Sequence, residues 1–166
     1  MEIMTREAAL RKLQRMAYEI VESNFGENEI ILAGIKENGL IIAGILSGFL
    51  KSIFAGKITI LGIEINKKDP VHVSLDSGKA DAELNNKVII ITDDVANSGR
   101  TLSYSLRPFL DYYPSKIQTL VLVERSYKKF PVTPDYKGLS IATALSERIV
   151  VETLNGEVLG ARIENE

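Results

Sequence analysis

The chain alternates between unbroken apolar runs rich in β-branched residues and longer stretches whose apolar residues recur at helical spacing. Apolar runs at 29–35, 88–91 and 117–123 are typical of parallel strands buried on both faces. Residues 57–66 alternate enough to predict another strand. Strands that alternate with helices predict an α/β fold, in which a Rossmann-like central parallel sheet is flanked by helices.

Three helices follow from the apolar spacing. The first begins after Thr5, a good N-cap residue, and ends near Asn24. The second, at 40–54, is apolar around most of its circumference, which predicts burial against the sheet or in a subunit interface. The third is predicted at 101–112, after a turn of small residues.

The remaining segments carry weaker signals. A short alternating strand is predicted at 71–75, and the polar residues at 76–86 predict a mobile loop or a short hairpin. The C-terminal part, 130–166, contains turn signals around short apolar runs at 139–142 and 149–151.

Ligands of open parallel sheets bind outside the carboxyl ends of the strands. Three polar loops follow predicted strands, at 36–39, 93–101 and 124–128. Because these strand ends share one edge of the sheet, we expect the three loops to form one active site.

The most informative of these loops follows the apolar run at 88–91. Ser98, Gly99 and Thr101 offer backbone N–H groups and hydroxyls that suit a phosphate at the start of a helix. Asp93 and Asp94 would repel a phosphate but accept hydrogen bonds from sugar hydroxyls. The loop therefore predicts a site for a phosphorylated sugar, with Mg²⁺ as its companion, and it matches neither a P-loop nor a dinucleotide-binding motif.

The sequence Asp-Asp-Val-x-x-Ser-Gly-Arg-Thr after an apolar strand resembles the phosphoribosyl-pyrophosphate motif of type I phosphoribosyltransferases. The resemblance implies that fold, as a single domain over 1–166, with a small hood formed mainly by about 125–166 and the N-terminal segment. It also implies transfer of a phosphoribosyl group from phosphoribosyl pyrophosphate to a nucleobase, with Mg²⁺ and release of pyrophosphate, as in nucleotide salvage. Asp93 and Asp94 would then hold the ribose hydroxyls and Mg²⁺, directly or through water. The 5′-phosphate would be held by Val95, Ala96, Asn97, Ser98, Gly99, Arg100 and Thr101.

A second part of the resemblance lies in the loop after the first strand, which holds pyrophosphate in these enzymes, often with a cis peptide that here falls near Ile35–Lys36. Lys36 would be catalytic and place a cation on the diphosphate, although it also fits a solvated charge at a strand end. Relatives carry arginine around a threonine where Glu37 and Asn38 stand, and an acid beside pyrophosphate is unfavourable, so we expect altered diphosphate affinity or turnover. The loop consists of Ile35, Lys36, Glu37, Asn38 and Gly39.

Residues 121–126, 130–132 and 134–138 resemble the region leading into the hood of the pyrimidine-operon attenuator/uracil phosphoribosyltransferase family, and more distantly of hypoxanthine–guanine enzymes. The hood holds the base, so the resemblance implies base contacts from Glu124, Arg125, Ile149 and Val150. Arg125 fits a structural ion-pairing residue equally well.

Two departures from the family pattern affect the expected substrate. Purine-salvage relatives carry an acid where Asn97 stands, and an amide cannot transfer a proton at neutral pH. The purine assignment is therefore weakened, and the resemblance to the family implies uracil as the favoured base and a 6-oxopurine as the next. The closing loop expected at 71–83 is short, and His72 and Lys79 are its only candidates for covering the diphosphate.

Composition restricts the other possibilities. The 166 residues, 45% hydrophobic and 25% charged, contain no cysteine and one histidine, which excludes a disulfide framework and a thiolate or multi-histidine metal site. The N-terminal residues lack the order of a signal peptide, and the most apolar stretch, 40–50, is too short to span a bilayer. We therefore expect a cytoplasmic protein with no membrane partner.

Two other functions compete with transfer. An RNA-binding attenuator is disfavoured by the net charge of −2, although Arg6, Arg11, Lys12 and Arg15 supply a local basic patch. A nucleotide-binding regulator with weak or no catalysis is suggested by Glu37, Asn38 and the short closing loop. The expected partners are phosphoribosyl pyrophosphate, a nucleobase or nucleoside monophosphate, and a second copy of the chain in a homodimer.

Overall fold

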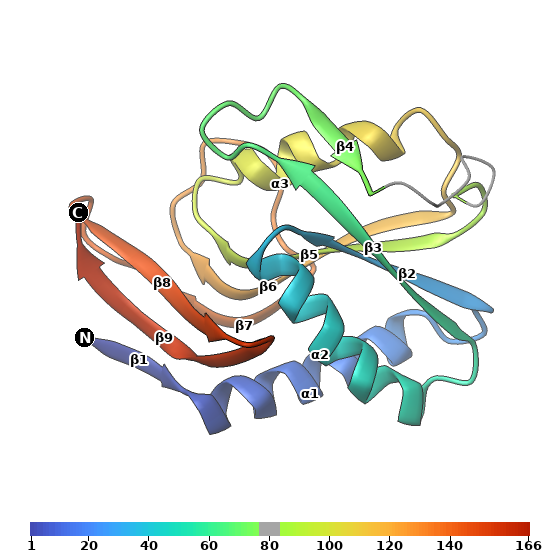
Figure 1. The fold of residues 1–166 in the computed structure, drawn as a ribbon, viewed down its shortest axis with the longest axis horizontal. Helices are drawn as coiled ribbons and strands as arrows, with labels where there is room; N and C mark the ends of the chain where they lie inside the picture. Colours follow the sequence, from blue (N-terminus) through green and yellow to red (C-terminus); the bar gives the residue numbers. More distant parts are fainter. Residues whose placement is uncertain (77–83) are drawn as a thin grey trace.

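The computed structural model describes residues 1–76 and 84–166 and contains a central six-stranded sheet in the order β4-β3-β2-β5-β6-β7 (Figure 1). All neighbouring pairs are parallel except β3 and β4. The predicted α/β fold with a largely parallel sheet is therefore confirmed. The strands are β2 (Glu29–Ile35), β3 (Lys57–Ile65), β4 (Val73–Leu75), β5 (Val88–Ala96), β6 (Lys116–Arg125) and β7 (Tyr136–Ile141).

Helices cover both faces of this sheet. Helices α1 (Arg6–Ser23) and α2 (Asn38–Ile53) pack against one face, on which Ile30 and Ile90 are buried. The short helix α3 (Arg100–Ser105) and a 3₁₀ turn pack against the other face, on which Ile31 is buried. Successive strand residues point to opposite faces, which is why the central strands are apolar without interruption.

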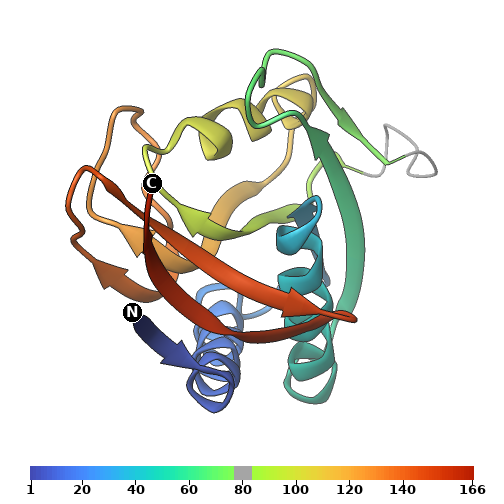
Figure 2. The ribbon, with the colours of Figure 1, turned by 60° about the vertical axis from the view of Figure 1, so that its left-hand side comes forward.

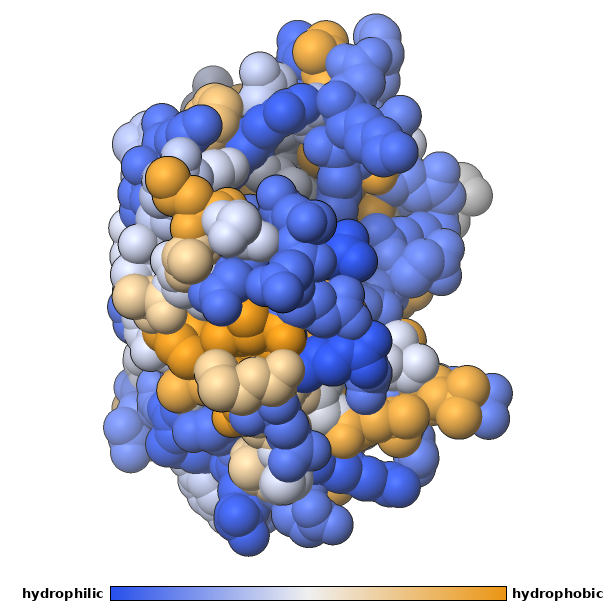
Figure 3. Space-filling view, turned by 90° about the vertical axis from the view of Figure 1, so that its left-hand side faces the viewer, coloured by the Kyte–Doolittle hydropathy of each residue, from blue (hydrophilic) through white to orange (hydrophobic). Residues whose placement is uncertain are grey.

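A second, three-stranded antiparallel sheet, called the small sheet below, joins the two ends of the chain. Its order is β1 (Glu2–Thr5), β9 (Glu157–Asn165) and β8 (Glu147–Leu154). Figure 2 shows β8 and β9 running across the front of the molecule, and Figure 3 shows a patch of apolar residues bordered by hydrophilic ones on this side. Val151 and Val158 anchor the small sheet in the core that it shares with α1 and α2.

Several boundaries differ from the predictions. β5 continues through the two aspartates to Ala96, because β6 is long enough to pair with it as far as Glu124. The helix predicted at 101–112 ends at Ser105 and gives way to the 3₁₀ turn Arg107–Phe109, since Pro108 cannot donate to an α-helical ladder.

The C-terminal part also differs in detail. β9 was not predicted, and β7 pairs with β6 in the large sheet, so only part of 125–166 lies in the small sheet. Residues 77–83 of the predicted mobile loop, Lys79 among them, lie outside the described residues. None of the helices in the described part of the chain has the length and hydropathy needed to cross a bilayer.

Candidate active site

A cavity of about 340 Å³ lies between the carboxyl end of β5 and strand β8. It brings together segments from four places in the chain. Its lining consists of Asn38, Lys67, residues 94–102, Arg148, Ile149, Val150 and Val151. Of the three polar loops predicted to form one site, 93–101 lines the cavity and 36–39 contributes Asn38, whereas no residue of 124–128 lines it. Strand β8 of the small sheet lies on the opposite side of the cavity.

The loop between β5 and α3 forms one wall of this cavity. Its turn requires Gly99, which has a φ of +85°, and a Cβ there would lie 3.1 Å from the carbonyl oxygens of Phe130 and Val132. The carbonyl oxygen of Ser98 accepts hydrogen bonds from the N–H groups of Lys129 and Phe130, at 2.9 and 3.0 Å. The loop is therefore held on the segment that follows β6. All the residues predicted to bind the 5′-phosphate, from Val95 to Thr101, line the cavity.

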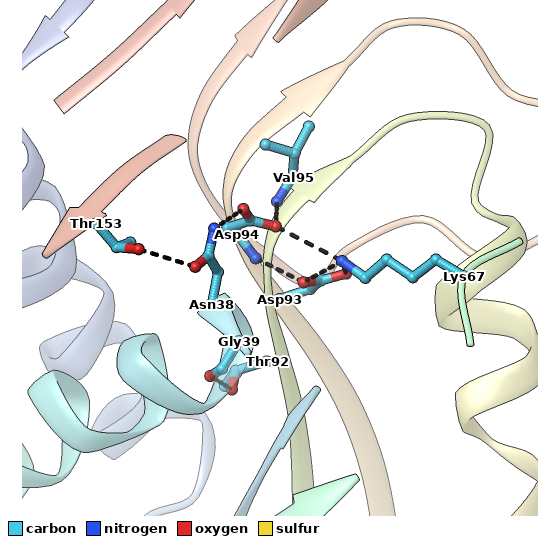
Figure 4. A network of polar contacts seen from close by, with 8 residues as sticks. All are labelled: Asn38, Gly39, Lys67, Thr92, Asp93, Asp94, Val95 and Thr153. Carbon is cyan, nitrogen blue, oxygen red and sulfur yellow. Dashed lines mark hydrogen bonds and ion pairs between the residues drawn. The ribbon is translucent and has the colours of Figure 1, made fainter. Parts of the chain in front are cut away.

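The two aspartates of β5 occupy different environments. Asp94 lines the cavity, whereas the side chain of Asp93 is 1% exposed and lies beside it. The Lys67 ammonium is 3.1 and 3.2 Å from the two carboxylate oxygens of Asp93 and 3.9 Å from Oδ1 of Asp94 (Figure 4). Burial raises the pKa of Asp93 to about 7, the charge of Asp94 adds to this, and Lys67 opposes it.

Asn38 connects the acid pair to the small sheet. Its Nδ2 donates a hydrogen bond of 2.7 Å to Asp94, and its Oδ1 accepts one of 3.0 Å from Thr153 on β8 (Figure 4). The neighbouring Gly39 is fixed by Thr92, whose hydroxyl donates to the Gly39 carbonyl at 2.7 Å. A Cβ on Gly39 would lie 2.3 Å from the Thr92 carbonyl oxygen, so the start of α2 needs glycine to approach β5.

Lys36 faces away from this network. The cis peptide bond expected near Ile35–Lys36 is present one residue later, between Lys36 and Glu37. The Lys36 ammonium is 2.7 Å from Asp76 and 2.8 Å from Glu64, and hydrogen bonds to these two acids raise the pKa of Lys36. Of the five residues in the predicted pyrophosphate loop, Asn38 alone lines the cavity.

Three of the four residues predicted to contact the base lie at the cavity or beside it. Ile149 and Val150 line the cavity. Arg125 is 5% exposed and donates to Asn97 Oδ1 at 3.2 Å and to the Ala144 carbonyl at 2.7 Å, so it connects the cavity wall to the segment that leads into β8.

Glu124 does not line the cavity. Its carboxylate accepts hydrogen bonds of 2.9 Å from Lys137 and from Ser140. Burial would raise the pKa of Glu124, but these hydrogen bonds bring it below its usual value. Its surroundings are those of a structural ion pair between β6 and β7.

Three residues near the site were not singled out from the sequence: Lys67, Arg148 and Thr153. Lys67 follows the carboxyl end of a predicted strand, where site residues are expected, and this position could have indicated it. It was missed because residues 66–70 were interpreted only as the end of that strand. Arg148 lines the cavity and is 3.0 Å from Glu164 on β9. Arg148 and Thr153 lie on β8, the edge strand of the small sheet, and the pairing that brings β8 to the site was not predicted.

The model of the phosphoribosyl transferase domain matches residues 2–155 of the chain. The chain belongs to this phosphoribosyl transferase family. Two similar curated relatives are named "Bifunctional protein PyrR", from Macrococcus caseolyticus (33% identical) and Clostridium perfringens strain SM101 (34% identical). Each alignment covers 90% of this chain and 89% or 88% of the relative. The predicted resemblance to the attenuator branch and the predicted class of enzyme, a phosphoribosyltransferase, are confirmed.

Solved phosphoribosyltransferases share the fold at lower identity. A hypoxanthine-guanine phosphoribosyltransferase from Bacillus anthracis has a TM-score of 0.72 at 23% identity and covers 90% of this chain and 85% of its own. Hypoxanthine phosphoribosyltransferase from Trypanosoma cruzi (K68R mutant), complexed with the product IMP, has a TM-score of 0.78 at 16% identity, covering 97% and 83%. These likenesses concern the fold, and they leave the base used by this phosphoribosyltransferase open.

Proposed function

We propose that this phosphoribosyltransferase transfers the 5-phosphoribosyl group of phosphoribosyl pyrophosphate to a nucleobase nitrogen and releases pyrophosphate, with uracil as the favoured base and a 6-oxopurine next. The observation that carries the proposal is the lining of one cavity by the 95–101 loop, by the carboxylate of Asp94 and by the apolar residues Ile149 and Val150. These are the three kinds of surface that a phosphate, a ribose and a base ring require.

The two ends of the substrate have distinct partners in this proposal. Residues 95–101 hold the 5′-phosphate through backbone N–H groups and hydroxyls at the start of α3, and the Asp94 carboxylate accepts hydrogen bonds from the ribose hydroxyls. Asp93, which is buried beside Asp94, fixes its backbone by accepting a hydrogen bond of 2.9 Å from the Asp94 N–H. In this proposal Asp94 binds the substrate, and Asp93 holds Asp94 in position.

Mg²⁺ fits this donor set, because it usually takes one or two protein carboxylates and completes its shell with substrate oxygens and water. Asp94, and Asp93 when Lys67 leaves it, would hold the ion. When bound, Mg²⁺ supplies positive charge to the leaving diphosphate.

The protein's own contribution is positioning and electrostatics. Positive charge develops at the anomeric carbon as the diphosphate departs, and the Asp94 carboxylate in the cavity wall would stabilise it. Lys36 reaches the diphosphate only after leaving Asp76 and Glu64, to which it is bound at 2.7 and 2.8 Å. Strand β8 lines one side of the cavity and would limit the access of water to the reacting carbon.

The preference for uracil has two supports. The curated relatives that cover nine-tenths of the chain are bifunctional PyrR proteins. Asn97, whose side-chain oxygen accepts a hydrogen bond from Arg125, carries an amide that cannot act as a general acid or base toward a purine nitrogen at neutral pH. Ile149 and Val150 provide apolar contact to either kind of ring.

The test is pyrophosphate release from phosphoribosyl pyrophosphate and Mg²⁺ with uracil, hypoxanthine, guanine, xanthine or adenine added separately. The control is the Asp93→Asn/Asp94→Asn double variant. We expect release with uracil that the double variant loses. Release with a 6-oxopurine alone would reverse the substrate preference, and no release with any base would refute transfer.

A regulatory function is the second candidate, favoured by the acids around the proposed diphosphate position. Lys36 is neutralised by Asp76 and Glu64, and Glu37 stands beside it. A regulator of this kind binds phosphoribosyl pyrophosphate or a nucleotide without turnover, which the same assay distinguishes when combined with calorimetry. RNA binding by α1 is disfavoured, because Arg6 pairs with Glu157 and Arg15 with Glu19.

We also propose a homodimer through α2. Ile45 and Phe49 are half-buried on this helix, so a second copy of the chain would cover the apolar surface that the fold leaves exposed there. Light scattering should give about twice the chain mass of 18.3 kDa. A mass of one chain at micromolar concentration would refute the dimer.

A further inference from the structure

Lys67 occupies the place between the two carboxylates that a divalent cation would take. Its ammonium is 3.1 Å from Asp93 Oδ1 and 3.9 Å from Asp94 Oδ1 (Figure 4). Within residues 1–76 and 84–166, no other cationic side chain lies within 4 Å of either carboxylate. A buried carboxylate needs such a counter-charge, and the side chain of Asp93 is only 1% exposed.

The side chain of Lys67 is free to exchange partners, although its backbone is held. The adjoining loop is fixed by a hydrogen bond of 3.0 Å from the Lys68 N–H to Asn66 Oδ1, and by another of 3.0 Å from Arg100 to the Lys68 carbonyl. The Lys67 side chain is 46% exposed, lines the cavity and ends a flexible stem. Its ammonium can therefore turn from the acid pair to an anion in the cavity without movement of the loop.

An ammonium and a divalent ion cannot share these oxygens, because the two cations repel each other at this separation. We propose that Lys67 holds the cation position of the acid pair until substrate arrives, so that the divalent ion binds there only together with phosphoribosyl pyrophosphate. The diphosphate gives Lys67 another anion and leaves the acid pair to the metal. This inference rests on the proposed function for its substrate, but the exclusion of the metal by Lys67 does not require turnover.

The test is titration with Mn²⁺ at pH 8, followed by electron paramagnetic resonance, without phosphoribosyl pyrophosphate. Lys67→Gln removes the ammonium, and Lys67→Arg keeps a cation. Lys68→Gln is the matched control, because it removes the same charge from the exposed neighbouring residue. We expect Lys67→Gln to bind Mn²⁺ with a Kd lower by about tenfold or more than wild type, Lys67→Arg and Lys68→Gln. Adding Asp94→Asn to Lys67→Gln should remove the gain.

Equal Mn²⁺ affinity of Lys67→Gln and Lys68→Gln would overturn the inference, as would a gain that survives Asp94→Asn. If Lys67→Gln does not fold by circular dichroism, Lys67→Met takes its place, because it removes the charge and keeps an apolar stem. Its Kd for Mn²⁺ without phosphoribosyl pyrophosphate should be lower than that of wild type by about tenfold or more, and a Kd equal to that of wild type would overturn the inference. The proposed transfer is tested by a different measurement, pyrophosphate release, so its failure can be distinguished from failure of this inference.

Discussion

The hydroxyl of Thr153 on β8 donates a hydrogen bond of 3.0 Å to the side-chain oxygen of Asn38 at the start of α2, although 115 residues separate them. The amide group of Asn38 is thereby turned so that Nδ2 donates to Asp94 at 2.7 Å. The small sheet is therefore tied through one amide to the carboxylate proposed to hold the ribose. Because the link is made of two hydrogen bonds, it can be cut without disturbing the core.

Thr153→Val removes this hydroxyl while keeping the shape of the side chain. We expect kcat/KM for phosphoribosyl pyrophosphate to fall by about fivefold, because the loss of about 1 kcal/mol of hydrogen bonding loosens both β8 and Asn38. Steady-state kinetics measure the effect, with Thr133→Val as the control at an exposed threonine. Unchanged kinetics in both Thr153→Val and Asn38→Ala would show that the link has no part in substrate binding.

The parts of this site that could be predicted from the sequence are those that the chain presents as continuous segments. The 95–101 loop follows a buried strand and precedes a helix, so its place at the carboxyl edge follows from the fold class. The role of Ile149 and Val150 as cavity residues came from resemblance alone, and their position beside the cavity agrees with it.

The partners of individual charges could not be predicted in this way. Lys36 and Lys67 both follow strands at the same edge, yet Lys36 lies with Asp76 and Glu64 while Lys67 reaches Asp93. The choice depends on the lateral order of the strands and on the path of the loop after β3, which local periodicity does not encode. Glu124 likewise binds Lys137 on β7 and does not line the cavity, and the register of β6 with β7 is a tertiary property.

The second prediction concerns pH. The carboxyl of Asp93 keeps its proton up to a pKa of about 7 in the folded chain, against 3.8 for the unfolded chain. Between these values the folded chain binds more protons at Asp93, so this group's contribution to the unfolding free energy decreases as pH rises through the window. The loss of unfolding free energy caused by Asp93 amounts to at most about 4 kcal/mol between pH 4 and pH 8, and Asp93→Asn removes it.

Urea unfolding at several pH values measures this difference. Carboxylates such as Glu29, whose pKa is lowered in the fold, contribute with the opposite sign but are common to both proteins and cancel. In the control variant Asp111→Asn, at an exposed aspartate, the unfolding free energy should change with pH in parallel with that of wild type. A wild-type curve parallel to that of Asp93→Asn would contradict the raised pKa.

The third prediction separates two glycines. Gly99→Ala forces a Cβ onto a residue with φ of +85° and to within 3.1 Å of two carbonyl oxygens. We expect the unfolding free energy to fall by about 1–3 kcal/mol and binding of phosphoribosyl pyrophosphate to weaken more than tenfold, because the cavity wall shifts.

Gly44→Ala is the matched change in α2, where a Cβ has open space around it. It should raise the unfolding free energy by about 0.5–1 kcal/mol through helix propensity and leave ligand binding unchanged. Thermal unfolding and calorimetry measure both quantities. Equal binding of phosphoribosyl pyrophosphate by the two variants would argue against a phosphate site in the 95–101 loop.

The last prediction separates Glu124 from the residues that line the cavity. Glu124→Gln should lower the unfolding free energy by about 1–3 kcal/mol, because Lys137 and Lys128 lose a carboxylate that is 5% exposed and bound at 2.9 and 3.5 Å. The KM for the base should stay within about twofold, because Glu124 does not line the cavity.

Val150→Ala should show the reverse. Its KM for the base should rise about threefold or more because apolar contact is lost, and its stability should change little. Urea unfolding and initial rates with varied base measure the two effects. If Glu124→Gln raised the KM for the base without changing the stability, the result would support a contact between Glu124 and the base. The loss of a structural ion pair would lower the stability instead.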